Sequence, residues 1–157
     1  MKIKKILFIS LLPALILGGC TLKKAVMDVP VSDGSYHYQN KDLGFSLVLP
    51  ADFIYYQTQR TDTTDYVDLE IFVPTSDTGY VQEVPGYAKP IAIRVYKNKE
   101  AWEKHFANPT EVKNYQQLGS QGDKVYTIRY WTDIPIDWQG KWNQEMAKKI
   151  ASGFKIN

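Results

Sequence analysis

Cys20 is the only cysteine of the chain and the side chain best placed for covalent chemistry. It follows an uncharged apolar run and two small residues, Gly18 and Gly19. Small side chains let a peptidase approach the backbone closely, and the thiol can then carry a diacylglycerol thioether. We therefore predict signal cleavage between Gly19 and Cys20 and lipid attachment at Cys20. A lone cysteine cannot form an internal disulfide, so we expect a fold without one.

Residues 1–19 have the organisation of a signal peptide. Three lysines lie within the first five residues, and residues 6–17 carry no charge. A membrane-spanning helix needs about 20 apolar residues, whereas this run is shorter and contains Pro13. A basic segment followed by a short apolar segment is typical of exported proteins. We expect this segment to be removed.

The four residues Leu17-Gly18-Gly19-Cys20 resemble the lipobox of bacterial lipoproteins. The resemblance implies that the mature protein begins at Cys20 and is acylated there, for example by palmitate. Each buried methylene adds about 0.8 kcal/mol of membrane affinity, and two or more chains give stable anchoring. We expect an extracytoplasmic protein of the cell envelope, attached to a bacterial membrane through its lipid anchor. The alternatives of an inner, an outer or a sole membrane stay open.

Removal of the signal peptide would change the net charge. It takes away three of the 19 basic residues and none of the 17 acidic residues, so the formal charge falls from +2 to −1. Nucleic-acid binding requires a concentrated basic patch. We therefore expect no nucleic acid among the partners.

The sequence lacks the residue clusters that hold metals. His37 and His105 lie far apart without a nearby cysteine, so the spacing of a zinc site is absent. The densest acidic residues do not match a calcium-binding loop; they are Asp62, Asp65, Asp68 and Glu70. Asp68 and Glu70 alternate onto one strand face, which we expect to face solvent. We predict no metal and no other cofactor, and a packed or rim position for His105.

No sequence pattern indicates an enzyme. There is no G-x-S-x-G motif around a serine nucleophile, and nothing selects two carboxylates for glycoside hydrolysis. The glycines of residues 119–122 are predicted to form a hairpin turn rather than a phosphate-binding loop. We expect a non-enzymatic protein, with an envelope hydrolase as the least favoured alternative.

Residues 74–90 form the longest stretch without a helical or strand period, and they contain Tyr80 and Tyr87. Long loops within compact domains are often functional, and tyrosine is favoured at contact surfaces. Tyr80 and Tyr87 are therefore a candidate binding surface; the alternative is that they fold back over the sheet edge. The tryptophans with helical spacing are expected in the core: Trp102, Trp138 and Trp142.

Alternating apolar residues predict the strands that position these side chains. The clearest strand has its apolar face at Val67, Leu69, Ile71 and Val73. Further strands are predicted over residues 36–40, 45–49, 53–60, 90–97 and 124–132, with a turn over 61–64. Alternation of this quality is typical of an antiparallel sheet with at least one buried face.

Two helices are predicted among these strands. Asn98 is placed to cap a helix that ends before Pro109. A second helix is predicted to begin near Asp137, because apolar residues follow at every fourth position, and to end at Gly153.

These elements predict the α+β class, with an antiparallel β-sheet flanked by helices and preceded by a lipoprotein signal peptide. We divide the chain into a signal peptide over residues 1–19, an acylated tether over 20–35 and a folded domain over 36–157.

The folded domain resembles the PsbP-like domains of bacterial envelope lipoproteins. The resemblance is carried by residues 150–156 and by the opening Tyr38-x-Asn40-x-x-Leu43-Gly44-Phe45-Ser46, which runs to Pro50. The chain departs from the pattern at Phe53, where tryptophan is usual, and at Gly153, where a hydroxyl residue is usual. The resemblance implies an α/β/α sandwich and no shared catalytic residues.

The leading functional expectation is a macromolecule-binding or assembly module, with another envelope protein as the candidate partner. It draws on the resemblance, because relatives of that fold are mostly binding or assembly factors. The alternative is a small-ligand or glycan-binding domain that uses the aromatic loop as its wall.

Overall fold

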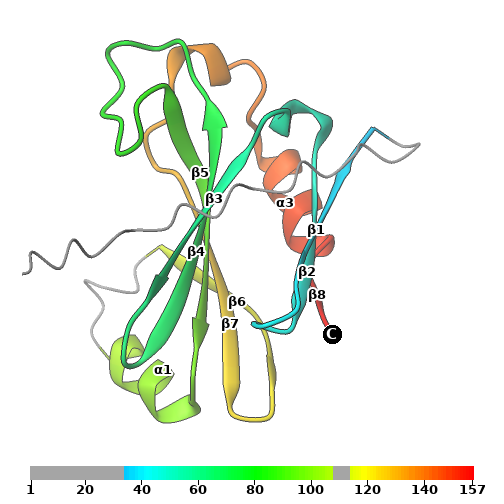
Figure 1. The fold of residues 1–157 in the computed structure, drawn as a ribbon, viewed down its shortest axis with the longest axis vertical. Helices are drawn as coiled ribbons and strands as arrows, with labels where there is room; N and C mark the ends of the chain where they lie inside the picture. Colours follow the sequence, from blue (N-terminus) through cyan, green and yellow to red (C-terminus); the bar gives the residue numbers. More distant parts are fainter. Residues whose placement is uncertain (1–33, 108–113) are drawn as a thin grey trace, which may run out of the picture.

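The computed structural model describes residues 34–107 and 114–157, whose strands form two antiparallel sheets (Figure 1). The α+β class is confirmed, but the single sheet that we predicted is wrong. Gly19 and Cys20, the signal peptide and nearly all of the tether lie outside the described residues.

The small sheet has the strand order β1-β2-β8. Its strands are β1 (Tyr36–Asn40), β2 (Phe45–Leu49) and β8 (Lys155–Ile156). The predicted hairpin of β1 and β2 is confirmed, with Tyr36 opposite Leu49. Its turn depends on Asn40, whose side chain accepts a hydrogen bond from the Leu43 amide at 3.0 Å, and on Gly44, whose φ is +79°. Glycine adopts such a φ without steric cost.

The large sheet has the strand order β3-β4-β5-β7-β6. Its strands are β3 (Gln57–Asp62), β4 (Tyr66–Pro74), β5 (Tyr87–Tyr96), β6 (Tyr115–Gln121) and β7 (Lys124–Tyr130). In β4 the predicted alternation is confirmed, since Val67, Leu69, Ile71 and Val73 are all buried. These side chains define the inner face of the large sheet.

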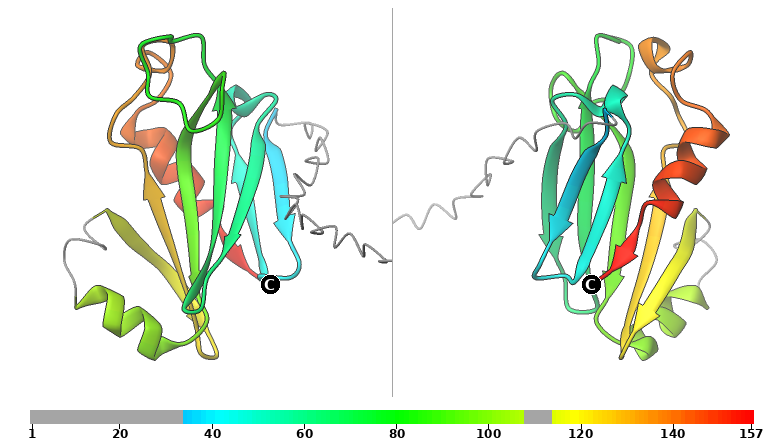
Figure 2. Two further views of the ribbon diagram at one scale, coloured as in Figure 1. Left: turned by 60° about the vertical axis from the view of Figure 1, so that its left-hand side comes forward. Right: turned by 90° about the vertical axis from the view of Figure 1, so that its right-hand side faces the viewer.

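The inner face packs on the small sheet and on the second helix, α3 (Gln144–Ser152), and these layers enclose the core (Figure 2). The ring of Phe45 in β2 meets the ring of Tyr126 in β7 edge-on, with centroids 6.3 Å apart. The buried Tyr126 hydroxyl donates to the Leu43 carbonyl at 3.0 Å. The Tyr130 hydroxyl donates to the Ala147 carbonyl of α3 at 2.8 Å. The outer face of the large sheet is the face directed away from the small sheet and from α3.

The first helix, α1 (Lys99–Phe106), begins as predicted. The Asn98 side chain accepts a hydrogen bond from the Ala101 amide at 2.8 Å, which satisfies one of the free N–H groups of the first turn. The helix covers one end of the outer face, where Ala101 packs with Tyr96 and Val125. His105 is packed there as expected, with its ring centroid 5.4 Å from that of Tyr66.

The predicted start of the second helix near Asp137 is wrong. Ile136–Trp138 is a separate 3-10 turn, η2, and α3 begins only after Asn143. The Asn143 side chain accepts from the Met146 amide at 2.9 Å, as an N-terminal cap does. Asp137 cannot cap this helix because its carboxylate is bonded to residues 75 and 76. Trp138 is buried in the core, as expected. It belongs to the 3-10 turn η2, however, and not to the predicted helix.

The end of α3 at Gly153 is as predicted. A Cβ atom at position 153 would lie only 2.9 Å from the Cβ of Val48 in β2. This close approach of the helix end to the small sheet explains why glycine is required at position 153.

Three strands have other bounds than predicted, and one of them is β5, which runs over Tyr87–Tyr96 instead of residues 90–97. Ala51–Phe53 is a 3-10 turn, η1, and β3 begins only at Gln57 and runs into the predicted turn. The reason is local, since Phe53 is fully buried and Tyr55 has a φ of +59°, which breaks an extended conformation. The strand predicted over 124–132 ends at Tyr130, and residues 119–121 belong to β6, so that the turn lies after Gln121.

Candidate functional site

The outer face of the large sheet carries charged and polar side chains in register. One row across β4, β5 and β7 holds Glu70, Ala92 and Arg129, and the next row holds Asp68, Arg94 and Thr127. The alternation that buries Val67 and Leu69 inward directs these residues outward. The outer face is therefore the polar face of the domain.

The prediction that Asp68 and Glu70 face solvent is wrong. Their side chains are only 15% and 16% exposed, because each is covered by a cation. Arg94 donates to both carboxylate oxygens of Asp68, at 2.7 and 2.8 Å. Lys89 donates to Glu70 at 2.7 Å and to Glu83 at 2.5 Å. Sequence spacing missed these pairs because the cations come from a neighbouring strand.

Arg94 is also enclosed by two aromatic rings. Its guanidinium carbon lies 3.7 Å from the ring centroid of Tyr66 and 4.6 Å from that of Tyr115. Partial burial alone would lower the pKa of Arg94, but the hydrogen bonds to Asp68 raise it above its ordinary value. Burial raises the pKa of Tyr115 to about 12. Arg94 and Asp68 thus form a two-bond ion pair with each other.

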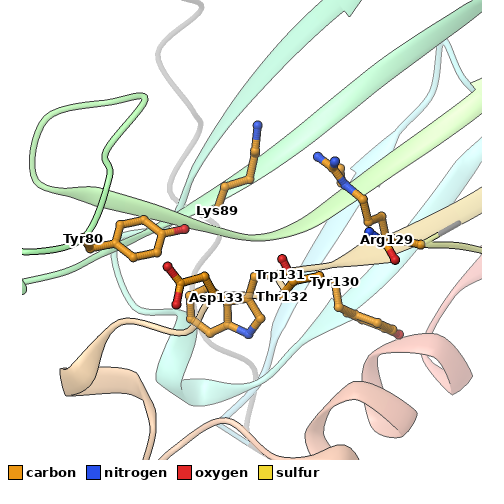
Figure 3. A pocket seen from close by; sticks show the side chains of 9 residues that line it. Tyr80, Lys89, Arg129, Tyr130, Trp131, Thr132 and Asp133 are labelled. Atoms are coloured by element: carbon orange, nitrogen blue, oxygen red, sulfur yellow. The ribbon is translucent and has the colours of Figure 1, made fainter. Parts of the chain in front are cut away.

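A small hollow of about 150 Å³ opens beside these pairs (Figure 3). Its floor lies between β5 and β7, and its walls come from the loops before β5 and after β7. The small side chain of Ala92 leaves room between Lys89 and Arg129, which rise from neighbouring strands (Figure 3). The lining residues are Tyr80, Lys89, Ala92, Asn114, Arg129, Tyr130, Trp131, Thr132 and Asp133.

Among the described residues of the hollow, Arg129 is the cation without a carboxylate partner. No carboxylate of the described residues lies within 4 Å of its guanidinium, whereas Lys89 has two carboxylate partners. The guanidinium carbon of Arg129 also lies 5.4 Å from the ring centroid of Tyr115. A planar guanidinium donates up to five hydrogen bonds and suits carboxylate groups. The hollow can therefore receive an acidic group.

The two tyrosines predicted as a binding surface lie in different surroundings. Tyr80 is half-buried and lines the hollow, and its partial burial raises the pKa of its hydroxyl. Tyr87 is the first residue of β5, and its hydroxyl accepts a hydrogen bond from Gln57 of the edge strand β3 at 2.7 Å. The structure thus brings Tyr80 together with Arg129 and leaves Tyr87 outside the hollow. Sequence reasoning missed Lys89, which fell within the stretch without a period, and Arg129, which was only one polar residue of a predicted strand.

Two aspartates hold the loop of Tyr80 in place. The Asp137 carboxylate accepts from the Thr75 hydroxyl at 2.8 Å and from the Ser76 amide at 2.9 Å. The Asp77 carboxylate accepts from the Ile136 amide at 2.9 Å and from the Gly79 amide at 2.9 Å. These bonds join the loop over residues 75–86 to η2, so the wall of the hollow is a positioned structure.

Asp137→Ala is expected to lower the free energy of unfolding by about 2 kcal/mol at pH 7, because bonds to a charged acceptor are lost. Partial burial alone would raise the pKa of Asp137, but the bonds from Ser76 and Thr75 outweigh it and hold the pKa below its ordinary value. The folded-state pKa is thus depressed. The stabilisation is therefore complete above the ordinary aspartate pKa and is lost as the pH falls through the folded value.

The measurement is urea unfolding of the parent and the variant between pH 7 and pH 2.5. The matched control is Asp133→Ala, which removes an exposed carboxylate four residues earlier. A difference between parent and Asp137→Ala that stays constant down to the lowest pH would contradict the assignment.

No family model, curated protein or solved structure matches this chain. Within residues 34–107 and 114–157, no helix has the length and apolar character needed to cross a membrane. In the same ranges no three His, Cys, Asp or Glu side chains are grouped as a metal site would require.

Proposed function

We propose that this chain is a lipid-anchored protein of the bacterial cell envelope whose folded domain is a non-enzymatic module that binds another macromolecule. The observation that carries the binding role is the hollow lined by Tyr80, Ala92 and Arg129, in which Arg129 has no carboxylate partner among the described residues. The lipobox-like residues that end at Cys20 support the anchored location.

The size and shape of the hollow favour a macromolecular partner over an enclosed small ligand. Small-molecule pockets commonly have volumes of about 300–1,000 Å³ and enclose most of the ligand. A hollow of about 150 Å³ instead fits a single side chain or chain terminus of a partner. Since Arg129 supplies the available donors, the partner presents an acidic group.

We also propose that the domain belongs to the PsbP-like folds. Support comes from the hairpin of β1 and β2, from α3 followed directly by the last strand β8, and from the antiparallel large sheet between α3 and α1. The PsbP-like assignment adds to the case for a binding or assembly role by analogy of fold alone.

The test is site-specific photo-crosslinking in the producing bacterium, with the photoreactive amino acid at position 80 of the full chain. We expect capture of an envelope protein, reduced by about tenfold or more in Arg129→Gln, because a hydrogen bond to a charged group contributes about 1.5–3 kcal/mol. Cys20→Ser should remove the acyl mass and release the protein from membranes. The same probe at Phe106, at the other end of the domain, is the matched control.

Each arm can contradict its part of the proposal. Equal capture from positions 80 and 106, or capture unaffected by Arg129→Gln, would overturn the hollow as the binding site. Unchanged mass and membrane fractionation in Cys20→Ser would overturn the anchored location.

A further inference from the structure

The described part of the chain exposes five large apolar side chains, and four of them belong to loops at one end of the domain. These four are Ile54 (49% exposed), Tyr55 (63%), Val81 (85%) and Ile136 (74%). Ile54 and Tyr55 follow η1, Val81 lies in the loop over residues 75–86, and Ile136 begins η2. Figures 1 and 2 show η1, this loop and η2 together at the end opposite α1, which carries the fifth residue, Phe106. We name these four residues the apolar end.

The apolar end is held rigidly by buried neighbours. The rings of Phe53 in η1 and Trp138 in η2 pack edge-on, with centroids 5.8 Å apart. The Trp138 indole donates to the Pro74 carbonyl at 2.9 Å, which joins η2 to the end of β4. Tyr55 is the one described non-glycine residue with a positive φ, +59°. Such backbone strain at an exposed aromatic residue is common at functional sites.

The chain enters the domain at the same end. A Cβ atom at Gly34, the first described residue, would lie 3.8 Å from the Cβ of Ala51 in η1. Thirteen residues, 21–33, lie between Cys20 and Gly34, and an extended chain over this distance reaches about 50 Å at most. A lipid on Cys20 would therefore be joined to the domain at the apolar end, within this distance of the bilayer.

We infer that the apolar end rests on the lipid bilayer, with the side chains of Ile54, Tyr55, Val81 and Ile136 in its interfacial region. The inference rests on the proposed lipid anchor, which supplies the proximity. Exposed apolar side chains at one end of a domain favour a contact site there, and tyrosine suits the membrane interface because its ring is apolar and its hydroxyl is polar. The neighbouring charged residues include the acidic Asp52, Asp77 and Glu83. The contact therefore depends on apolar burial and requires no anionic lipid.

The hollow would then lie beside the bilayer, because Tyr80 in its wall directly precedes Val81. A partner that reaches Arg129 must itself be at the membrane surface. This restricts the proposed partner to a membrane-associated envelope protein.

The test uses single new thiols in the full-length lipidated protein, since acylation occupies the thiol of Cys20. Val81→Cys and Ile136→Cys probe the apolar end, and Phe106→Cys is the control, an exposed apolar position at the opposite end. Each is labelled with a fluorophore and reconstituted into phosphatidylcholine vesicles with or without nitroxide-bearing lipid. We expect quenching at positions 81 and 136 to exceed that at 106 by about threefold or more, unchanged by salt, as expected for apolar interfacial binding.

The outcomes separate this inference from the proposed anchor. Intact mass shows whether Cys20 carries acyl chains. An acylated protein with equal quenching at 81 and 106 overturns the orientation alone. An acylated protein without quenching at 81 and 136 also overturns it and assigns the apolar end to a protein partner. A protein without acyl chains overturns both the anchor and the orientation that depends on it.

Discussion

Asp68→Ala is expected to lower the free energy of unfolding by about 3 kcal/mol, because removal of one partner of a largely buried ion pair leaves the other charge uncompensated. The Asp68 and Arg94 side chains are 15% and 13% exposed, and two hydrogen bonds join them. Without the carboxylate, the Arg94 guanidinium stays enclosed by Tyr66 and Tyr115. Urea unfolding at neutral pH measures the effect.

The matched control is Asp62→Ala on the adjacent strand. Asp62 also pairs with an arginine, Arg60, at 2.8 Å, but the two side chains are 54% and 39% exposed. Exposed pairs contribute about 0–1 kcal/mol. If Asp68→Ala destabilises the domain no more than Asp62→Ala does, the burial of the Asp68 pair has no energetic consequence and the prediction is wrong.

Trp138→Ala is expected to lower the free energy of unfolding by about 3–5 kcal/mol, the range for removal of a large buried aromatic side chain. Trp138 is 2% exposed and contacts Phe53 and Trp131 edge-on. It also donates a hydrogen bond to Pro74. Its loss leaves a cavity where η1, η2 and the end of β4 meet, so the wall of the hollow and the apolar end should loosen together.

Trp138→Phe is the conservative companion, since it keeps an aromatic ring and loses the indole N–H. We expect a smaller cost of about 1–2 kcal/mol, from one unsatisfied carbonyl and reduced packing. Limited proteolysis should cut the loop over residues 75–86 faster in Trp138→Ala than in Trp138→Phe. Equal stability and equal cleavage in the two variants would contradict the role of Trp138 as the central support of this end.

Much of the local structure was predictable from the sequence. The alternation in β4 and β5 was confirmed because a strand directs successive side chains to opposite faces. The hairpin of β1 and β2 was confirmed, and so was the cap at Asn98, because turns and caps depend on a few adjacent residues. The predicted end of the second helix at Gly153 was confirmed, whereas its predicted start near Asp137 was wrong.

The wrong start of the second helix has a tertiary cause. Asp137, Trp138 and Trp142 have the residue types of a helix start and its apolar face, so the local pattern favours one long helix. In the structure the Asp137 carboxylate bonds to Thr75 and Ser76, which lie more than 60 residues earlier. Trp138 is buried against Phe53 of η1. Bonds and packing over such distances override local propensity.

The candidate site was predictable only in part. Tyr80 was singled out by its loop and lines the hollow, but Tyr87 bonds to the edge strand instead. Arg129 and Lys89 belong to the same site only because β5 and β7 pair with Ala92 opposite Arg129. This strand register arises when the sheet assembles, and it cannot be predicted from the spacing of residues along the chain.

Local sequence patterns were sufficient to predict which side chains share a strand face, where the first helix begins and that the domain belongs to the α+β class. These properties follow from backbone geometry and from neighbours within a few residues. The division of the strands into two sheets and the covering of Asp68 by Arg94 became visible only in the folded domain. The same holds for the meeting of Tyr80, Ala92 and Arg129 around one hollow. The physical reason is that strand pairing and packing join segments far apart in the chain, whereas a periodic pattern specifies only the orientation of each segment.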